Sequence, residues 1–427
     1  MERADVVVVG AGAAGLMAGI FAGRSGAGRV VLLDGARKLG AKILVAGGGR
    51  CNVTHHAVNA RAYAGSTRGA IKKVLRRFDV PATVDFFADL GVDLKREETG
   101  KLFPTTDSAK TVLGALLRAN HEAGVEVRHP RRVETVEPAG DGFRVMGEWG
   151  EIEAARVVLA TGGKSLPKSG SDGHGYRIAE TLGHTVTRRV FPALVPLTLP
   201  AGHPLCALSG VTVPATIQLR SATGKKGKAF TDSTLLTHFG LSGPSVLDLS
   251  RYWLDAREDD EGAHVTVDWL PGTAPAALDA DFQALGTTVL RFLRERLPER
   301  LARALLDEAG VGPETTGDTL TRADRRALVE AVTALRLPLT GDRGYRYAEV
   351  TAGGVPLAEL DLGTMASRCT PGLYLCGEVC DVDGRIGGFN FQWAWASGHV
   401  AGTALGQTLS ARRAHVNSQR SPAQALS

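Results

Sequence analysis

Two glycine-rich segments near opposite ends of the 427-residue chain constrain the fold most strongly. The first, Gly10-Ala-Gly-Ala-Ala-Gly15, follows the apolar residues 6–9 and precedes a helix-like stretch at 13–24. A second apolar run at 30–33 ends at Asp34. Together they make a complete βαβ unit, which predicts a dinucleotide-binding Rossmann-like domain.

The glycine positions of this first segment predict how a dinucleotide lies on it. Gly10 permits the tight turn, Gly12 lets the backbone approach a pyrophosphate, and Gly15 allows the helix to pack closely on the strand. Ala13 and Ala14 begin the helix, so the phosphates would face its positive N-terminal end. We therefore expect all five residues to contact the cofactor.

The second segment, Gly372-Leu-Tyr-Leu-Cys-Gly-Glu378, completes the prediction of a single FAD site. Gly377 ends an apolar strand, and Glu378 then offers a carboxylate to the ribityl hydroxyls. Asp34, at the other end of the chain, stands where a carboxylate can accept hydrogen bonds from the adenosine ribose. The FAD-binding domain is thus expected to be assembled from both chain ends.

Three further segments predict cofactor contacts. Residues 47–49 are consecutive glycines followed by Arg50, and such backbone N–H groups with a cation suit a flavin or its pyrophosphate. Residues 157–163 are expected to form an apolar strand followed by a small-residue turn, which would lie beneath the nucleotide. A helix that starts at about residue 391 would aim its positive end at the flavin's pyrimidine edge. The expected cofactor residues in and around these segments are Lys42, Gly48, Gly49, Arg50, Cys51, Asn52, Val133, Thr161, Gly162, Gly388, Phe389 and Asn390.

Cys51 allows two interpretations. A small buried thiol that packs near the cofactor is favoured over a catalytic thiol, because buried free cysteines are usually unreactive. The five cysteines are scattered, and Cys376 and Cys380 do not have the spacing of a redox or zinc pair. We therefore expect neither a disulfide framework nor a metal site.

Asp381, Asp383 and Arg385 lie between Glu378 and the helix expected after residue 390. Their position predicts that they are close to the edge of the flavin ring. They are the candidate catalytic residues, for substrate positioning or proton delivery. A calcium loop is the competing interpretation of the acidic pair, but the ligand spacing of such a loop is absent.

The middle of the chain predicts an insertion into the FAD domain. Alternating apolar residues at 211–219 and 265–269 indicate antiparallel strands, whereas apolar residues spaced by four at 289–305 indicate a helix. A further helix follows Thr321-Arg-Ala-Asp324, a capping-box pattern. The expected organisation is an α/β fold with a two-dinucleotide-type FAD domain (1–188 and 343–409), an antiparallel β-barrel subdomain (189–272), a small helical subdomain (273–342) and a mobile polar tail (410–427).

Composition and charge limit the partners. The formal net charge of +5 is mild, and the basic residues look interspersed with acidic ones, so nucleic acid is not expected as a partner. The chain opens directly into its first strand and has no long uncharged apolar run, which predicts a cytoplasmic protein without a membrane segment. The oligomeric state is left open.

Several long strings resemble a known family. They include KILVAGGGRCNVT at 42–54, GKLFPTTDSAKTV at 100–112, THFGLSGP at 237–244 and GEVCDVDGRIGGFNFQWAWASG at 377–398. The chain resembles the bacterial NAD(P)/FAD-dependent oxidoreductases, a group that includes aminoacetone oxidase and flavoproteins that act on carbon-carbon double bonds of bile-acid intermediates. The resemblance implies an FAD-binding fold with an inserted β-barrel and a small helical segment. It does not imply a particular substrate.

The predicted function is hydride transfer between FAD and a small organic substrate. Reduction of C=C or C=N bonds, with NADH or NADPH as a transient reductant, competes with amine oxidation by molecular oxygen. A flavin-containing RNA-modifying or sensory protein is the alternative from another class. No second glycine fingerprint follows a strand, so a nicotinamide would have to enter the open flavin cleft.

Overall fold

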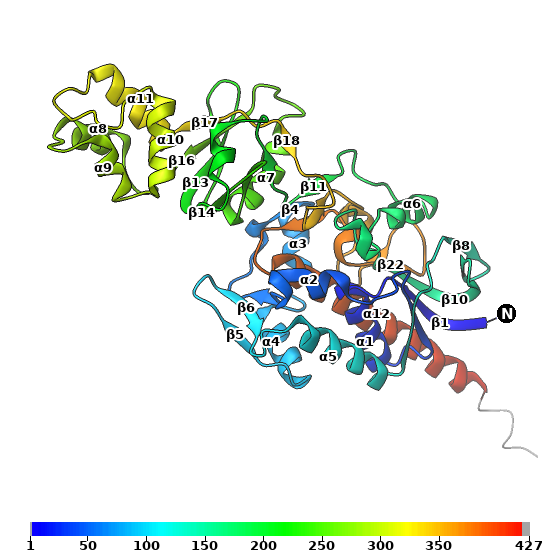
Figure 1. The fold of residues 1–427 in the computed structure, drawn as a ribbon. Coiled ribbons are helices and arrows are strands. Elements are labelled where there is room, and N and C mark those ends of the chain that lie inside the picture. The colour runs from blue at the N-terminus through cyan, green and yellow to red at the C-terminus, as the bar shows by residue number, and fades with distance from the viewer. Residues whose placement is uncertain (1, 421–427) are drawn as a thin grey trace, which may run out of the picture. The chain divides into compact units, whose positions relative to one another are not determined.

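The computed structural model describes residues 2–420, with side chains up to residue 415. Contacts divide it into two compact units (Figure 1): residues up to Phe191 together with those from Val350 onward, and the inserted span Pro192–Glu349. The first unit combines both chain ends, as in the predicted FAD domain, although its edges differ slightly from the expected 188 and 343. The finer division of the insertion at residue 272 stays a prediction.

A parallel sheet forms the centre of the first unit. Its parallel strands, in spatial order, are β22 (Leu373–Leu375), β10 (Gly150–Leu159), β1 (Glu2–Val9), β2 (Val30–Leu33) and β7 (Val125–Arg128). Val7 pairs with Val157 on one side and with Val31 on the other, and all three are completely buried. Such continuous apolar runs are typical of parallel strands covered on both faces.

Two helices from opposite chain ends pack against each other in this unit. They are α1 (Ala13–Arg24), at the predicted bounds, and α12 (Phe389–Arg420). Their contact is close because α12 has glycines where they cross: a Cβ atom at Gly398 would lie 2.4 Å from the Ala14 carbonyl oxygen, and one at Gly402 2.4 Å from that of Ala18. These glycines of α12 therefore allow tight helix packing.

The mobility expected of the polar tail at 410–427 stays a prediction, but part of the tail has regular structure. Residues 410–420 continue α12 as regular helix, and only 421–427 lie outside the described residues. The polar sequence of this segment hides its helical character, because a helix without an apolar stripe gives no periodic signal.

The other elements of the first unit surround the sheet. The helices are α2 (Ala41–Gly49), η1 (Ala60–Ala62), α3 (Arg68–Leu75), α4 (Val80–Asp89), α5 (Ala109–Glu122), η2 (Pro167–Ser169), α6 (His174–Thr181), η4 (Leu357–Glu359) and η5 (Gly377–Val379). The strands are β3 (Thr54–His55), β4 (Tyr63–Gly65), β5 (Leu94–Arg96), β6 (Lys101–Pro104), β8 (Thr135–Ala139), β9 (Gly142–Gly147), β19 (Val350–Ala352), β20 (Leu360–Asp361), β21 (Ala366–Ser367) and β23 (Val382–Gly384). A strand β11 (Phe191–Ala193) spans the boundary between the units.

The inserted unit has an antiparallel seven-stranded sheet. Its order is β17 (Leu335–Leu337), β16 (His264–Asp268), β13 (Thr212–Arg220), β14 (Lys226–Thr237), β15 (Gly240–Ser242), β12 (Leu197–Thr198) and β18 (Gly341–Asp342). The alternation predicted for β13 is present, with Val213, Ala215 and Ile217 buried on one face. The expected barrel is not confirmed, because the described ladders run as an open path from β17 to β18.

The helices of the insertion depart from the sequence prediction in two places. They are η3 (Pro204–Leu208), α7 (Pro244–Ala256), α8 (Pro275–Gln283), α9 (Val289–Arg294), α10 (Glu299–Ala309) and α11 (Arg322–Thr333). The helix expected across 289–305 is two helices, because Pro298 caps α10 and cannot continue α9. Helix α7 was not predicted within the β segment, whereas the Thr321 capping box of α11 is confirmed.

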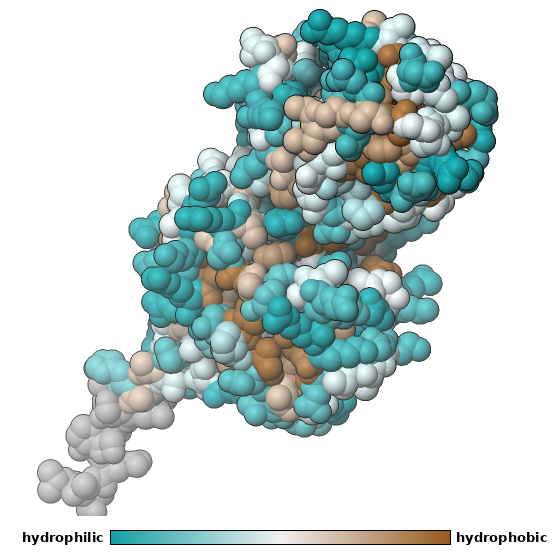
Figure 2. All heavy atoms as spheres, turned by 90° about the vertical axis from the view of Figure 1, so that its left-hand side faces the viewer, coloured by the Kyte–Doolittle hydropathy of each residue, from teal (hydrophilic) through white to brown (hydrophobic). Residues whose placement is uncertain are grey.

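The surface is mainly hydrophilic on the face drawn in Figure 2, with a hydrophobic strip across the body that carries the C-terminal end. None of the described helices is long and apolar enough to cross a membrane.

Candidate functional site

The two glycine signatures meet in the first unit. A Cβ atom at Gly377 would lie 2.7 Å from the Ala14 Cβ, and the buried Cys376 Sγ lies 3.9 Å from the Ala14 carbonyl oxygen. Gly377 has a φ of +79°, which glycine adopts freely. Trp393 of α12 donates its indole N–H to the Gly377 carbonyl at 3.0 Å. The start of α1, the turn after β22 and the start of α12 thus form one site.

Within the first signature, the three glycines have different surroundings. A Cβ atom at Gly15 would lie 1.8 Å from the Gly10 carbonyl oxygen, and one at Gly10 would lie 2.5 Å from that of Ala160. A Cβ atom at Gly12 would meet nothing within 4 Å. Gly12 is the N-cap of α1, where no side chain caps the helix. The predicted space for a pyrophosphate is therefore open, and the N-terminal N–H groups border it.

Asp34 lies at the end of β2, next to this turn. One of its carboxylate oxygens accepts the Ala11 N–H at 2.7 Å, and the other accepts the Ala36 N–H at 2.7 Å. The Asp34 carbonyl accepts the Arg131 N–H, which places the segment that includes the buried Val133 nearby. Asp34, predicted to bind the adenosine ribose, and Val133, predicted as a cofactor residue, therefore lie in one corner of the unit.

Lys42 and Glu378, predicted from distant motifs, form an ion pair. Lys42 Nζ lies 2.7 Å from Glu378 Oε2 and donates to Ser165 Oγ at 2.7 Å. Glu378 Oε1 accepts from Ser165 Oγ and from the Thr351 N–H, each at 3.0 Å. Ser165 and Thr351 were not predicted. Thr351 lies in the Thr351-Ala-Gly-Gly segment, whose glycine-rich character was the available signal.

The three glycines at the C-terminal end of α2 have an irregular, non-helical backbone, as expected for consecutive glycines. Gly47, Gly48 and Gly49 have φ values of +58°, +71° and +87°, and a Cβ atom at Gly48 would meet nothing within 4 Å. The Arg50 side chain has other partners than the open space beside Gly48. Its guanidinium forms an ion pair with Glu97 at 2.6 Å and lies over the Phe103 ring. The cation predicted to serve the cofactor is thus already bound to a carboxylate.

Cys51 has the surroundings of a packing thiol. Its side chain is completely buried, and burial raises its pKa to about 12, so the thiol stays protonated at neutral pH. Its φ of +63° is uncommon for a residue with a side chain. These features favour the structural interpretation of Cys51 over the catalytic one.

Two predicted cofactor residues carry buried polar atoms without a partner among the described residues. They are Asn52 Oδ1 and Thr161 Oγ1, and Ser171 Oγ, which was not predicted, is a third. A Cβ atom at Gly162 would lie 2.8 Å from Ser171 Oγ, so Ser171 lies beside the turn after β10. Buried unpaired polar atoms are costly unless a ligand pairs with them. Together with the open space at Gly12 and Gly48, they fit a polar dinucleotide.

The candidate catalytic residues lie on and beside β23. This strand pairs with β4, and Asp383 is opposite Ala64. Asp381 and Asp383 are buried, and Ser66 donates its hydroxyl to Asp381 Oδ2 at 3.3 Å and its N–H to the Asp381 carbonyl at 2.8 Å. Arg385 follows β23, and its N–H donates to the Ala62 carbonyl.

The start of α12 fixes the loop that carries Arg385. Asn390 Oδ1 accepts the Gly384 N–H at 2.8 Å, and its Nδ2 donates to the Gly384 carbonyl at 2.9 Å. The Phe389 carbonyl accepts the buried Tyr63 hydroxyl at 2.7 Å. Gly388 has a φ of +94°, and a Cβ atom there would lie 2.5 Å from the Thr54 carbonyl carbon. The Asn390 side chain thus shapes the loop, whereas its predicted contact with a flavin stays a prediction.

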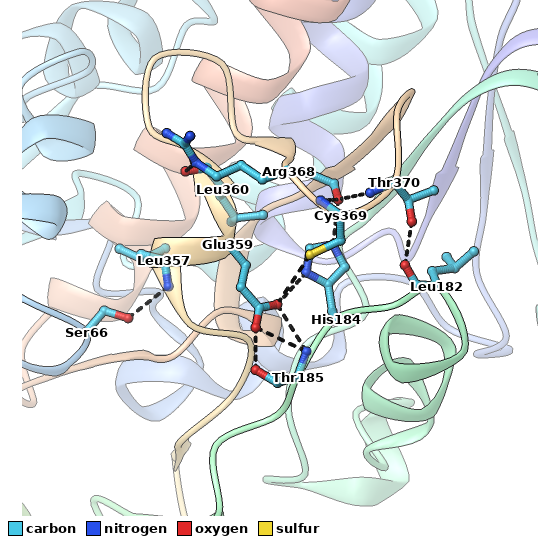
Figure 3. Close-up of polar contacts among 11 residues, drawn as sticks. Ser66, Leu182, His184, Thr185, Leu357, Glu359, Leu360, Arg368, Cys369 and Thr370 are labelled. Atoms are coloured by element: carbon cyan, nitrogen blue, oxygen red, sulfur yellow. Dashed lines mark hydrogen bonds and ion pairs between the residues drawn. The ribbon is translucent and has the colours of Figure 1, made fainter.

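A polar cluster elsewhere in this unit has donor atoms suited to a metal, although the sequence predicted none. Atoms of His184, Glu359 and Cys369 lie within 4.8 Å of one another. Figure 3 shows Glu359 directed at His184 and Thr185. His184 Nδ1 lies 2.8 Å from Glu359 Oε2, and its Nε2 lies 2.8 Å from Ser367 Oγ.

Hydrogen bonding accounts for this cluster without a cation. Ser367 Oγ accepts the N–H groups of Cys369 and Thr370, so its own proton goes to His184 Nε2. The other ring nitrogen, Nδ1, then carries the proton that Glu359 accepts. Although burial opposes its ionisation, bonds from Thr185 and His184 keep the pKa of Glu359 below its ordinary value. We assign the cluster a structural role between the end of α6 and β20–β21.

Comparison with known proteins identifies the family. The family model of the HI0933-like protein Rossmann domain matches residues 4–404. The chain belongs to this family. It is 37% identical over 93% of its length to an Escherichia coli protein named ribosomal RNA dihydrouridine synthase, of which 96% is covered. It is 34% identical over 94% of its length to a Clostridium scindens 3-dehydro-bile acid delta(4,6)-reductase, of which 98% is covered.

A solved structure supports the fold alone. The 3-ketosteroid delta1-dehydrogenase of Sterolibacterium denitrificans matches with a TM-score of 0.52 at 13% identity, covering 96% of this chain and 100% of the other. The family membership and these relatives confirm that the protein is an FAD-dependent oxidoreductase with a Rossmann-type domain. The expectation that nucleic acid is not a partner is not supported, because a close relative is named for a reaction on ribosomal RNA.

Proposed function

We propose that the protein reduces the ring double bond of a uracil base in ribosomal RNA, giving dihydrouridine. The two relatives are named for reactions of one kind, in which a carbon-carbon double bond conjugated to a carbonyl is reduced. In uracil this bond is C5=C6, conjugated to the C4 carbonyl. In a 3-dehydro-bile acid it is conjugated to the 3-oxo group. The shared chemistry supports the reductase alternative of the sequence analysis over amine oxidation.

One observation favours RNA over a small apolar enone. Residues 35–78 contain ten Lys and Arg residues and no Asp or Glu, whereas the rest of the chain has 40 basic and 45 acidic residues. The expectation of interspersed charges is therefore wrong for this segment. A local excess of positive charge supplies much of the affinity of proteins for polynucleotides.

The residues of the candidate site fit FAD, and each has a proposed role. Bound FAD, once reduced by NADH or NADPH, would supply a hydride to C6 of the base, and a proton drawn from solvent would complete the reduction at C5. Gly12 and the start of α1 would hold the pyrophosphate. The Lys42–Glu378 pair, held by Ser165, would orient the ribityl chain. Arg385, fixed by Asn390, would stabilise the negative charge that develops on the C4 oxygen.

The substrate assignment is tested by reoxidation of the reduced protein. The FAD-loaded protein is reduced anaerobically with NADPH or NADH and then mixed with oligouridylate, a 3-oxo-Δ4 steroid, or an amine. We expect oligouridylate to restore the oxidised flavin spectrum. Reoxidation by the steroid alone would support the small-enone alternative, and bleaching of the oxidised flavin by an amine would support the oxidase.

The role of Arg385 is tested with two variants. Arg385→Lys keeps a cation, whereas Arg385→Met removes it. We expect Arg385→Met to slow reoxidation by oligouridylate about 100-fold or more, as for loss of one oxyanion-stabilising group, while flavin reduction by the nicotinamide stays unchanged. Partial rescue by Arg385→Lys supports the electrostatic role, and equal rates in all three proteins contradict it.

A further inference from the structure

Five exposed basic side chains cluster on α3 and its C-terminal end. This α3 basic face consists of Arg68, Lys72, Lys73, Arg76 and Arg77. Arg68, Lys72 and Arg76 are spaced by four residues, so they form a row with steps of about 6 Å along the axis. The apolar residues at 71, 74 and 75 are buried on the opposite side of the helix. The packing of the helix therefore directs the charged row outward.

These charges are poorly compensated. Lys42 and Arg50 of the same basic segment pair with carboxylates, but the five side chains of the α3 basic face form no ion pair with any described residue. Lys73 is close enough to Asp361 to contribute to lowering the pKa of that carboxyl. Like charges four residues apart oppose helix formation, and Arg68 in the first turn opposes the helix dipole. Lys72 and Lys73, in the last turn, favour the dipole, so these charges together contribute little net stability to the helix.

The α3 basic face adjoins the candidate catalytic strand. Helix α3 follows β4 directly, and β4 pairs with β23. Ser66, in the turn that leads into α3, hydrogen-bonds to both the side chain and the backbone of Asp381. Its hydroxyl also accepts the Leu357 N–H at 3.0 Å (Figure 3), so the turn is fixed from two sides. A chain bound along α3 would therefore lie next to Asp381 and to β23, which carries Asp383.

We propose that the α3 basic face binds the phosphates of the RNA strand that carries the target uridine. This inference rests on the proposed function and assigns it a surface. The row of Arg68, Lys72 and Arg76 follows the backbone of a single strand, while the base enters the site beside β23. Contacts of this kind position a strand without reading its sequence.

The test uses the FAD-loaded protein and a fluorescent oligouridylate. Lys72→Gln/Arg76→Gln removes two charges from the row, and Arg291→Gln/Arg294→Gln removes two exposed arginines from α9 as the charge-matched control. Binding is measured over a range of salt concentrations. The α3 variant is expected to bind about 10-fold more weakly, with a slope of log K against log salt that is reduced by about 1.4, since each lost contact to a single strand contributes about 0.7. The control is expected to match the wild type.

The melting temperature and the rate of flavin reduction distinguish a lost RNA contact from a loss of stability or of flavin chemistry. The melting temperature of the α3 variant should be nearly unchanged, because relief of repulsion between like charges offsets the loss of Lys72 from the last turn, where it favours the helix dipole. The rate of flavin reduction by NADPH should also be unchanged. Equal salt slopes in all three proteins would overturn the α3 assignment while leaving reduction of uridine in RNA intact. Absence of oligouridylate binding by the wild type at low salt, with active reduction of a steroid enone, would overturn both.

Discussion

Replacement of Gly12 by valine should separate cofactor binding from folding. Gly12 has φ −79° and ψ −171°, which any residue adopts, and a Cβ atom there meets nothing within 4 Å. The loss of glycine flexibility stabilises by about 0.4–1 kcal/mol, and a poorer N-cap costs about as much. The free energy of unfolding without cofactor should therefore change by less than about 1 kcal/mol.

The effect on FAD should be much larger. A branched side chain would fill the space expected for the pyrophosphate. Loss of two hydrogen bonds from N–H groups to a charged phosphate costs about 3–6 kcal/mol, which is about 10²- to 10⁴-fold in Kd. Titration of the apoprotein with FAD, followed by flavin fluorescence, measures this loss, and chemical denaturation measures stability.

The matched variant is Gly15→Ala, for which the structure predicts the reverse order of effects. Its Cβ would lie 1.8 Å from the Gly10 carbonyl oxygen, so the backbone must move. Overpacking of this kind costs about 1–3 kcal/mol or more. A folded Gly12→Val protein that binds FAD like the wild type would refute the placement of the pyrophosphate.

Three further substitutions test other parts of the site. Cys51→Ala should keep FAD and most activity. Because burial holds the pKa of Cys51 at about 12, this thiol in the native protein should resist alkylation at pH 8, while the exposed Cys369 reacts. Rapid loss of activity on alkylation of Cys51 would contradict the packing role. Lys42→Met should lower FAD occupancy and destabilise the fold by about 1–3 kcal/mol, since it leaves the Glu378 carboxylate partly buried without its cation. Full FAD occupancy with an unchanged denaturation midpoint would refute the role of the Lys42–Glu378 pair. Burial lowers the pKa of His399 from 6.5 to about 4, so the unfolded chain binds the proton first and stability should fall as pH drops from about 6.5 to about 4. His399→Phe should reduce that loss, and an unchanged pH dependence of the melting temperature would show that His399 is not its source.

The parts of the fold that local sequence determines were predictable. The unit from β1 through α1 to β2 has fixed glycine positions and a buried apolar run on each side. The predicted bounds of α1 and β2 agree with the structure, whereas β1 begins at Glu2, before the predicted residue 6. The capping box at Thr321 is likewise a local hydrogen-bonding pattern. Such features depend on neighbouring residues and need no knowledge of distant contacts.

Features that depend on distant contacts were harder to predict. The polar end of α12 has no apolar periodicity, and the apolar spacing of four across Pro298 hides a break between two helices. Lys42 and Glu378 could be chosen as cofactor residues, but their pairing through Ser165 requires the fold. The charge of residues 35–78 was readable from the sequence, yet the net charge of the whole chain obscured it.

Direct analysis of ribosomal RNA tests the central claim. Ribosomal RNA lacking dihydrouridine is incubated anaerobically with the FAD-loaded protein and NADPH or NADH, digested to nucleosides and examined by mass spectrometry. We predict that dihydrouridine appears with time, in an amount matched by the nicotinamide oxidised, and that heat-inactivated protein produces none. Oxidation of nicotinamide coupled to reduction of a steroid enone, with every uridine in the RNA unchanged, would contradict the account.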